Sequence, residues 1–153
     1  MVKSFQGVRV VEPKKAPIQN ITVKDHMSTK LITFKEDDTI EQVMEALTKK
    51  KISGAPVVDH SGALVGIISE VDCLREIIKG KYSNTPKFPA KVSEHMTKDV
   101  ITLSPDLSLF DAAQKFLELR IRRFPVLKEG KLVGQISLSD VIRAFPKLNQ
   151  TTW

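Results

Sequence analysis

The sequence predicts an α/β fold in which two β-α-β-β-α repeats pack as a pseudo-twofold pair. The first reason is an internal duplication, because Val23–Arg75 aligns with Val92–Arg143 at an offset of 69 residues that falls to 68 after the turn near Ser61. The second reason is that short apolar runs alternate with segments of helical periodicity within each copy. Duplicated units of this kind stack against each other, and we expect clefts between the two halves.

Composition and spacing divide the chain into five segments. We expect an extended arm at 1–20, a first repeat at 21–80, a linker at 81–91, a second repeat at 92–146 and a tail at 147–153. Hydrophobic content of 41% and charged content of 27% are ordinary for a globular chain of 153 residues. One repeat of roughly 55 residues is marginally stable by itself, so we expect the halves to share a core.

The sequence favours a protein of the reducing cytoplasm that does not contact membranes. No apolar run approaches the roughly 18 residues that a membrane span needs, and no export signal is expected at the N-terminus. Cys73 is the one cysteine, so an internal disulfide cannot form. Because Cys73 aligns with Val141 of the other repeat, we expect a small buried apolar residue rather than a reactive thiol.

The net charge of +6 is concentrated outside the repeats. Residues 79–91 carry four lysines and no acid, and residues 1–20 carry four basic residues against Glu12. Basic tails can bind nucleic acid or acidic lipid. These tails are short and lack a recognition helix or interleaved aromatic residues. We therefore interpret them as solvated linkers and keep a nucleic-acid binder as a lower-ranked alternative.

Each repeat begins with a short apolar strand followed by an amphipathic helix. In repeat one the strand is Leu31–Phe34, and Thr39 with Gln42 forms a capping box at the start of the helix. In repeat two Ser108 and Asp111 start the helix. Apolar residues at helical spacing predict the inner faces, which are Ile40, Val43, Met44 and Leu47 in repeat one and Leu109, Ala112, Ala113 and Phe116 in repeat two.

A hairpin of two apolar strands follows the helix in each repeat. The strands are Ala55–Val58 and Leu64–Ile68 in repeat one, and Phe124–Leu127 and Leu132–Ile136 in repeat two. Gly62 and Gly130 mark the turns between them. Pro56 and Pro125 lie at the openings of the strands, where a missing N–H group is tolerated.

A second helix closes each repeat. It begins at Ser69 or Ser137, and we expect it to stop at Gly80 or Pro146. Apolar spacing predicts that its buried face consists of Val71, Leu74 and Ile78 in repeat one and of Val141, Ile142 and Phe145 in repeat two. Pro86 and Pro89 predict an extended loop between the repeats. In the arm, the predicted edge strand consists of Val8, Val10 and Val11.

The chemically informative motif is Ser-x-x-Asp, which occurs at the last strand-to-helix turn of both repeats. It comprises Ser69 and Asp72 in repeat one and Ser137 and Asp140 in repeat two. One interpretation is structural, since this spacing caps many helices. The other is functional, because a helix N-terminus offers free N–H groups to a phosphate and a carboxylate accepts hydrogen bonds from ribose hydroxyls. A site with both serine and aspartate therefore suits a nucleotide better than it suits free phosphate.

These motifs resemble a tandem pair of CBS domains, the module named for cystathionine β-synthase, over about residues 21–145. The resemblance is carried by Val-x-Asp/Glu-x-Met, a Pro-Val strand, a Leu-Val-Gly strand and Ser-x-x-Asp, each present twice in the same order. It implies a flat, twofold-related α/β pair with two clefts for adenosine-containing ligands such as AMP, ADP, ATP, S-adenosylmethionine or NAD. It also implies a disc-shaped homodimer and a regulatory role, such as energy sensing, toward another protein.

The resemblance assigns residues of both repeats to the parts of such a ligand. Aspartates 72 and 140 would hold ribose hydroxyls, and serines 69 and 137 would lie near ribose or phosphate. Backbone groups would frame the adenine at Thr33, Thr102, Ala55, Pro56, Phe124 and Pro125.

Basic residues before the Pro-Val strand often meet phosphate in this family. Repeat two has Arg122 and Arg123 at that position, where repeat one has Ser53 and Gly54. The resemblance therefore implies that the two phosphate sites differ. A solvated surface pair is the alternative interpretation of the two arginines, and the sequence leaves open which cleft they serve.

Other chemistry is disfavoured by the spacing of the polar residues. His26 and His95 occur once per repeat, without the closed ligand set that zinc requires. Arg75 and Arg143 each follow an aspartate by three residues, where an ion pair along the helix is the simplest account.

No glycine-rich phosphate loop or nucleophile set is present in the sequence, so we expect no enzyme activity. We predict a stand-alone regulatory module that binds AMP or a related mononucleotide and has no obligatory cofactor. The alternative is a ligand-free module that dimerises and docks a partner protein.

Overall fold

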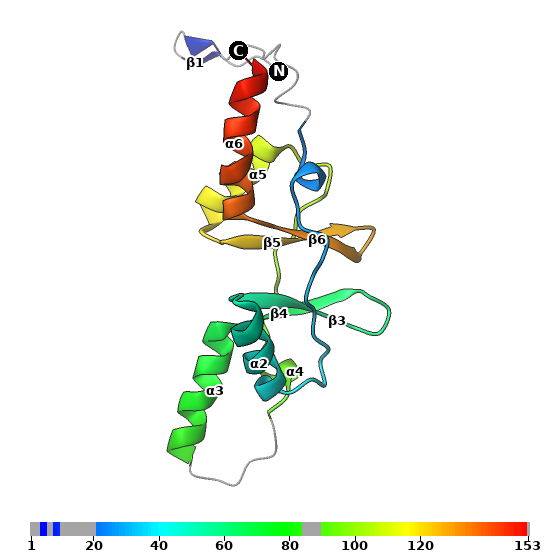
Figure 1. Ribbon diagram of the computed structural model, residues 1–153, viewed down its shortest axis with the longest axis vertical. Coiled ribbons are helices and arrows are strands. Elements are labelled where there is room, and N and C mark those ends of the chain that lie inside the picture. Colours follow the sequence, from blue (N-terminus) through cyan, green and yellow to red (C-terminus); the bar gives the residue numbers. More distant parts are fainter. Residues whose placement is uncertain (1–3, 6–7, 10–20, 84–89, 153) are drawn as a thin grey trace.

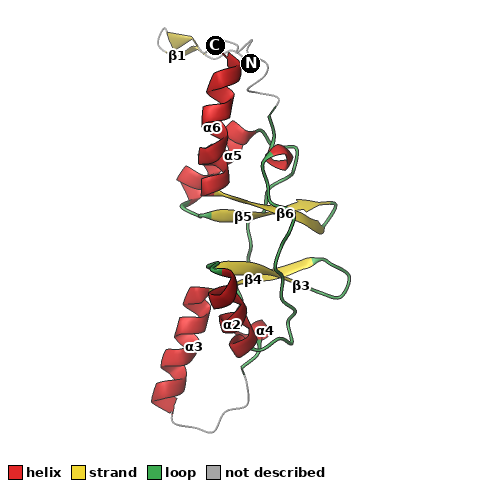
Figure 2. Ribbon diagram, in the orientation of Figure 1, coloured by secondary structure: helices red, strands yellow, loops and turns green. Residues whose placement is uncertain are grey.

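The computed structural model describes residues 4–5, 8–9, 21–83 and 90–152, with the side chains of 21–80 and 90–146. Two lobes lie end to end, and each contains a two-stranded sheet with helices on its outer side (Figure 1). The two sheets face each other across the centre of the molecule (Figure 2). The predicted pair of α/β repeats is therefore confirmed.

Each lobe follows the element order that the duplication predicts. Lobe one contains α2 (Ile40–Lys50), β3 (Gly54–Val58), β4 (Leu64–Ser69) and α3 (Glu70–Ser83). Lobe two contains α5 (Leu109–Leu119), β5 (Arg123–Lys128), β6 (Lys131–Ser137) and α6 (Leu138–Thr152). Both hairpins are antiparallel, and each has a register shift near its turn.

The strand expected before the first helix is shorter than predicted in both repeats. It consists of one parallel bridge, which joins Phe34 to Val57 in lobe one and Leu103 to Val126 in lobe two. In lobe one, Phe34 N donates to Pro56 O at 3.0 Å and Val58 N donates to Phe34 O at 2.9 Å. These bonds fix a single residue to β3, because the chain before it is crossing from the other lobe.

The first helix of each repeat is capped as predicted. Gln42 N donates to Thr39 Oγ1 at 3.2 Å, and Thr39 N donates to Gln42 Oε1 at 2.8 Å, so α2 has a reciprocal capping box. Asp111 N donates to Ser108 Oγ at 3.0 Å at the start of α5. The buried inner faces are Ile40, Val43 and Leu47 on α2 and Leu109, Ala112 and Phe116 on α5.

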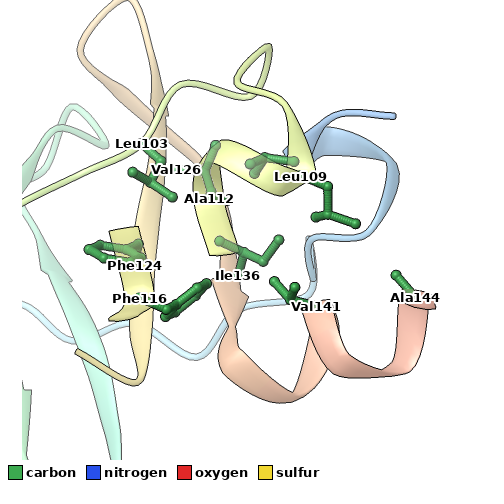
Figure 3. Close-up of a cluster of buried hydrophobic side chains, with 10 residues drawn as sticks. Leu103, Leu109, Ala112, Phe116, Phe124, Val126, Ile136, Val141 and Ala144 are labelled. Atoms are coloured by element: carbon green, nitrogen blue, oxygen red, sulfur yellow. The ribbon is translucent and has the colours of Figure 1, made fainter. Parts of the chain in front are cut away.

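The opening segment of each repeat packs into the opposite lobe. The short helix η1 (Val23–Asp25) opens repeat one, yet Val23 is fully buried in the core of lobe two. The helix α4 (Val92–His95) opens repeat two, yet Val92 is fully buried in the core of lobe one. The expected single shared core is therefore two cores, each completed by the other repeat. Figure 3 shows the core of lobe two, which contains Leu103, Leu109, Phe116, Phe124 and Ile136.

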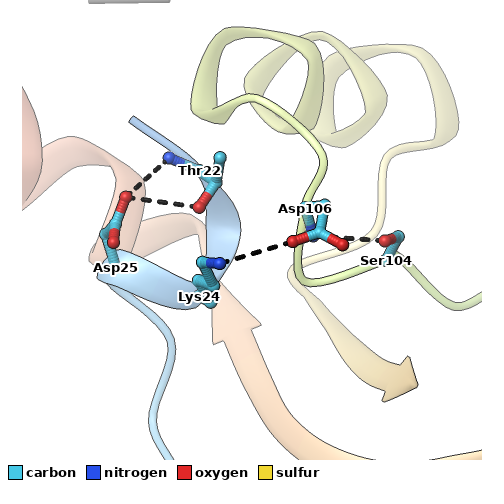
Figure 4. A network of polar contacts seen from close by, with 5 residues as sticks. All are labelled: Thr22, Lys24, Asp25, Ser104 and Asp106. Carbon is cyan, nitrogen blue, oxygen red and sulfur yellow. Dashed lines mark hydrogen bonds and ion pairs between the residues drawn. The ribbon is translucent and has the colours of Figure 1, made fainter. Parts of the chain in front are cut away.

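Polar contacts also hold η1 against lobe two (Figure 4). Asp25 Oδ2 accepts from Thr22 N at 2.9 Å, which closes the turn, and Lys24 Nζ lies 3.5 Å from Asp106 Oδ1 across the contact. Asp106 N in turn donates to Ser104 Oγ at 3.1 Å. Because the Lys24–Asp106 pair is exposed, its contribution is about 0–1 kcal/mol, and the buried Val23 is the main anchor.

This exchange, in which the opening segment of each repeat packs into the opposite lobe, explains the glycine of the repeated Leu-Val-Gly motif. A Cβ atom at Gly134 would lie 2.5 Å from Met27 Sδ and 2.9 Å from Ser28 O. At Gly66 it would lie 2.7 Å from Met96 Sδ and 2.9 Å from the backbone oxygen of residue 97. The exchanged methionine and its following residue therefore press directly onto the strand of the opposite lobe.

The predicted buried face of the second helix is wrong in part. Val71, Leu74 and Ile78 of α3 are 54%, 57% and 49% exposed, and Ile142 of α6 is 61% exposed. Val141 is buried as predicted, and Phe145 is partly buried against the core. The physical reason lies at the start of the helix, where Asp72 has to turn back toward the strand. This turn directs Asp72 and its neighbour Cys73 inward and rotates the apolar positions outward.

The predicted ends of these helices are also wrong. α3 continues through Gly80 to Ser83, and α6 continues through Pro146 to Thr152. A glycine costs a helix about 1 kcal/mol and does not terminate it by itself. A proline removes one backbone donor, and a helix that has packing partners can tolerate the loss of that bond. The extended linker therefore cannot begin at residue 80 or 81.

The arm and the rest of the linker lie largely outside the described residues. Within the arm, β1 (Ser4–Phe5) and β2 (Val8–Arg9) form a small antiparallel ladder, so Val8 pairs with Phe5. Val10, Val11, Pro86 and Pro89 are not among the described residues. None of the helices in the described ranges is long and apolar enough to cross a membrane.

Candidate functional site

Each Ser-x-x-Asp motif forms a closed corner at the N-terminus of the second helix. In lobe one, Asp72 Oδ2 accepts from the backbone N–H and the hydroxyl of Ser69, at 2.8 Å and 3.0 Å. In lobe two, Ser137 N donates to Asp140 Oδ2 at 2.8 Å and Asp140 N donates to Ser137 Oγ at 3.1 Å. The capping interpretation is therefore confirmed in both repeats. We call these two features the Asp72 corner and the Asp140 corner.

An arginine one turn along each helix meets the second carboxylate oxygen. Arg75 Nη1 lies 3.7 Å from Asp72 Oδ1, and Arg143 Nη2 donates to Asp140 Oδ1. The predicted ion pairs along the helix are confirmed. The Asp72 side chain is 7% exposed and the Asp140 side chain 16% exposed, so Asp140 is the more accessible carboxylate. A carboxylate offers about four acceptor positions, which leaves capacity beyond these contacts.

The positions that open β3 and β5 lie beside the corners. Gly54 is paired with Ser69 in the first hairpin, and Arg123 is paired with Ser137 in the second. Arg123 is half-buried, and its Nη1 donates to Gly54 O of the other repeat at 3.3 Å. The structure therefore brings one of the two predicted phosphate-binding arginines to the boundary between the lobes.

The residues immediately before these strands are exposed. Their backbone oxygens tie the strand to the following helix, since Ser53 O accepts from Glu70 N and Arg122 O accepts from Leu138 N, both at 2.9 Å. The side chains of Ser53 and Arg122 are thus free of the backbone ladder and border the corners.

The residues expected to frame an adenine lie within the hairpins. Ala55, Pro56, Phe124 and Pro125 are buried in β3 and β5. The carbonyl oxygens of Pro56 and Pro125 accept from Phe34 N and Leu103 N, both at 3.0 Å. The Phe124 ring packs against Phe116 with 4.8 Å between ring centroids, so this side chain belongs to the core.

Thr33 lines a separate cleft at the turn end of the first hairpin. The cleft measures about 240 Å³ and is lined by Thr29, Leu31, Thr33, Val58, Gly62, Leu132 and Val133. It therefore lies between the two repeats, but at the opposite end of β3 from the Asp72 corner. Its volume is slightly below the roughly 300 Å³ at which typical ligand pockets begin. Thr102 occupies the equivalent position in repeat two, next to the bridging Leu103.

Two groups near the corners have shifted pKa values. Burial raises the pKa of the Cys73 thiol, with smaller contributions from the charges of Asp72 and Glu70. The thiol is 4% exposed, as expected for a small buried residue. At the hairpin turn, hydrogen bonds from the Ser61 hydroxyl and the Ala63 N–H lower the pKa of Asp59.

The histidines of the repeats have different surroundings. His95 Nε2 lies 2.9 Å from Glu76 Oε2, which joins α4 to α3 within lobe one. The residue equivalent to Glu76 in repeat two is Ala144, so the sequence offers His26 no matching carboxylate. Within the described ranges, no group of three or more metal-ligating side chains converges.

Sequence reasoning missed three features of this region. One is the contact between Arg123 and Gly54, which depends on how the lobes face each other. Another is the participation of Leu132 and Val133 in the cleft, for which the repeated Leu-Val-Gly motif was the available signal. The third is the exposed apolar stripe of α3, which helical spacing alone cannot distinguish from a buried face.

Comparison with known families accounts for both halves of this arrangement. The model of the CBS domain matches residues 23–79 and 92–147, which together make up most of the chain. The chain belongs to the CBS domain family. It is thus a pair of CBS domains in one chain, and the predicted family is confirmed.

Solved CBS pairs share this fold. The crystal structure of CBSX2 of Arabidopsis thaliana in complex with AMP superimposes with a TM-score of 0.74 at 31% identity, over 84% of this chain and 98% of that chain. The CBS domain pair of protein MJ0100, in complex with 5-methylthioadenosine and S-adenosyl-L-methionine, superimposes with a TM-score of 0.70 at 30% identity, over 83% and 97%. CBS pairs that resemble this chain therefore bind adenosyl ligands.

Among curated relatives, protein MJ1225 of Methanocaldococcus jannaschii is 32% identical over 124 residues. That alignment spans 81% of this chain but 42% of MJ1225, so the chain corresponds to less than half of that relative.

Proposed function

We propose that this chain is a regulatory module without enzyme activity, which binds an adenine nucleotide of the AMP type between its CBS domains. The observation that carries the proposal is the pair of Ser-x-x-Asp corners, each at the N-terminus of a long helix beside the boundary of the lobes. The helix N-terminus favours an anion, and the spare acceptor positions of the carboxylate suit ribose hydroxyls. The AMP complex of CBSX2 supports this ligand class.

In this proposal Asp140 and Asp72 hold ribose, and serines 137 and 69 lie near ribose or phosphate. Arg122 and Arg123, at the start of β5, meet phosphate. Backbone groups of residues 33, 55, 56, 102, 124 and 125 frame the base. Ser53 lies at the ligand site at the position before β3. Ligand binding would shift the equilibrium between arrangements of the lobes only through different affinity for each arrangement.

The test is the substitution Asp140→Ala, because Asp140 is the more exposed of the two carboxylates. Loss of hydrogen bonds to a charged group should weaken AMP binding by about 1–3 kcal/mol in calorimetry. The matched control is Asp111→Ala, which removes a carboxylate from the start of α5 outside the corners. Unchanged AMP affinity in Asp140→Ala would contradict the role of the corner.

Dimerisation of the module is the second part of the proposal. Leu74 and Ile142 occupy equivalent positions on α3 and α6 and are 57% and 61% exposed. Exposed apolar surface on both helices is typical of a protein interface, and a second copy of a pseudo-symmetric chain can cover both. In sedimentation, Leu74→Glu and Ile142→Glu should lower the apparent mass, whereas Ile101→Glu, which changes an exposed residue of a connecting segment, should not.

The alternative function is a ligand-free interaction module that uses the same helices. A thermal-shift panel of AMP, ADP, ATP, NAD and S-adenosylmethionine distinguishes the two. Stabilisation by ligand follows mass action, so a binder should show a concentration-dependent rise in Tm with at least one of these compounds. A protein that stays unchanged across the panel would favour the interaction module.

A further inference from the structure

The contact between Arg123 and Gly54 joins equivalent positions of the two repeats. Each of these residues opens its strand, and each is paired with the serine of its own corner, Ser69 or Ser137. A contact between equivalent positions lies around the axis that relates the two copies. The guanidinium of Arg123, 3.3 Å from Gly54 O, is therefore on the pseudo-twofold axis, between the Asp72 corner and the Asp140 corner.

In a second contact across the axis, a cation of repeat two again meets a backbone oxygen of repeat one. Ala63 and Lys131 are also equivalent positions, and they form an antiparallel bridge, while Lys131 Nζ donates to Ser61 O at 3.0 Å. In both contacts repeat two provides a cation and repeat one provides a backbone oxygen. Lys131 is exposed and lies at the hairpin turns, whereas Arg123 is half-buried and lies at the corners.

The partner of Arg123 is a weak competitor for a guanidinium. Gly54 O is a neutral carbonyl that accepts a single bond, whereas a phosphate carries the opposite charge and can accept two guanidinium N–H groups in a bidentate pair. A phosphate held at either corner would therefore draw Arg123 from Gly54. Once drawn to one phosphate, the side chain is oriented away from the other corner, and the first phosphate adds repulsion toward a second.

We propose that Arg123 is a specificity residue shared by the Asp72 corner and the Asp140 corner, so that a phosphate-bearing adenosine ligand at one corner weakens the binding of a second such ligand at the other. The proposal rests on the proposed function, since it requires that adenosyl ligands occupy the corners. It adds that the coupling acts through phosphate. Adenosine, which has no phosphate, is not subject to the coupling, and the effect is reciprocal between the two corners.

Calorimetric titration with AMP and with adenosine tests this in three proteins. In the unmodified chain, the ratio of the two stepwise dissociation constants should be at least about tenfold larger for AMP than for adenosine, as expected when one charged hydrogen-bonding group serves a single ligand. In Arg123→Met, the stronger AMP step should weaken by about 10- to 100-fold, and the ratio should fall toward the adenosine value, with only the repulsion between the two phosphates remaining. Lys131→Met, which removes the other cation on the axis, should behave as the unmodified chain.

The outcomes separate the two proposals. An AMP ratio that Arg123→Met leaves unchanged overturns the shared role of Arg123 while nucleotide binding stands. Absence of binding of both AMP and adenosine to the unmodified chain overturns the proposed function and this inference together. Circular dichroism verifies folding, and Arg123→Gln provides a second neutral variant with the same expected loss of coupling if the methionine variant fails to fold.

Discussion

The two repeats are alike at the ends of their helices and differ where the two lobes meet. Both close the first helix with a left-handed residue, Lys51 at φ 55° and Arg120 at φ 54°, and both have the Ser-x-x-Asp corner. On the pseudo-twofold axis, repeat one has Gly54 and Ala63 where repeat two has Arg123 and Lys131.

The difference follows from the geometry of a pair. A residue that caps or closes a helix within one lobe has equivalent neighbours in both copies, so the same kind of side chain suits both. A residue on the axis faces its own equivalent. Two arginines placed about 4 Å apart would repel by about 1–4 kcal/mol at effective dielectric constants between those of water and a protein surface. A duplicated chain therefore avoids a cation at the same axial position in both copies, and here the other copy has the small, uncharged Gly54 and Ala63.

The largest expected effect is a loss of stability on substitution of Phe124, a core residue that differs between the two lobes. Phe124 is fully buried beside Phe116, whereas its equivalent in lobe one is the small Ala55. Phe124→Ala removes a core ring and should lower the free energy of unfolding by about 3–5 kcal/mol, measured by urea denaturation. The control is Leu117→Ala at a site 78% exposed, where a change of less than about 0.5 kcal/mol is expected. A loss below 1 kcal/mol for Phe124→Ala would mean that this core is loosely packed.

Substitutions that disturb the exchanged segments should destabilise the two lobes by similar amounts. Gly66→Ala and Gly134→Ala each place a methyl group against a methionine sulfur and a backbone oxygen of the other repeat. We expect each substitution to destabilise the protein by about 1–3 kcal/mol, since the site is already filled.

Second substitutions identify the obstacle in each lobe. Met96→Ala should partly rescue Gly66→Ala, and Met27→Ala should partly rescue Gly134→Ala, because only the sulfur contact is relieved. Very different losses in the two lobes would show that the exchange is not symmetric.

The sequence predicted most of what a single repeat determines. Capping boxes, turn glycines and helical spacing located the helices and the hairpins, because these signals depend on neighbours within a few residues. The corner geometry was also foreseen as a cap, and Asp72 and Asp140 do bind back to Ser69 and Ser137.

What the sequence did not predict depends on the relation of the two lobes. Val23 and Val92 are apolar and would suit the core of either lobe. No local sequence pattern therefore indicates that each packs into the lobe of the other repeat. Similarly, Leu74 has the spacing of a core residue, and its 57% exposure follows from the rotation that Asp72 imposes on α3. The contact of Arg123 with Gly54 likewise requires the second repeat to be in place.

Substitution of the two arginines of repeat two should distinguish binding of the phosphate group from binding of the adenosine part of the ligand. Replacement of both Arg122 and Arg123 by alanine should weaken AMP by about 1.5–3 kcal/mol, the scale of a hydrogen bond to a charged group, and should change adenosine binding much less. Competition between the two ligands in calorimetry provides the measurement, and Lys128→Ala, an exposed cation at the far end of β5, is the control. Equal losses for AMP and adenosine would contradict a phosphate contact.

The smallest expected effect distinguishes the two hairpin turns. In repeat one, Asp59 Oδ1 accepts from Ser61 N at 2.8 Å, from Ser61 Oγ at 2.7 Å and from Ala63 N at 3.0 Å, and these bonds hold its pKa below the ordinary 3.8. Repeat two is one residue shorter at this turn and has Lys128 at the equivalent position. Only the first turn therefore depends on an ionised carboxylate.

The sign of the pH effect follows from the lowered pKa of Asp59. A carboxyl group that is more acidic in the folded state stabilises it above the unfolded pKa, and that contribution is lost as the pH falls through the folded value. In an NMR titration, the amide shifts of Ser61 and Ala63 should change with a midpoint below 3.8, and Asp59→Asn should abolish the transition. Asp37→Asn, at another exposed carboxylate of the same lobe, should leave it intact. A midpoint at or above the ordinary value would mean that the turn is held by its backbone, as in repeat two.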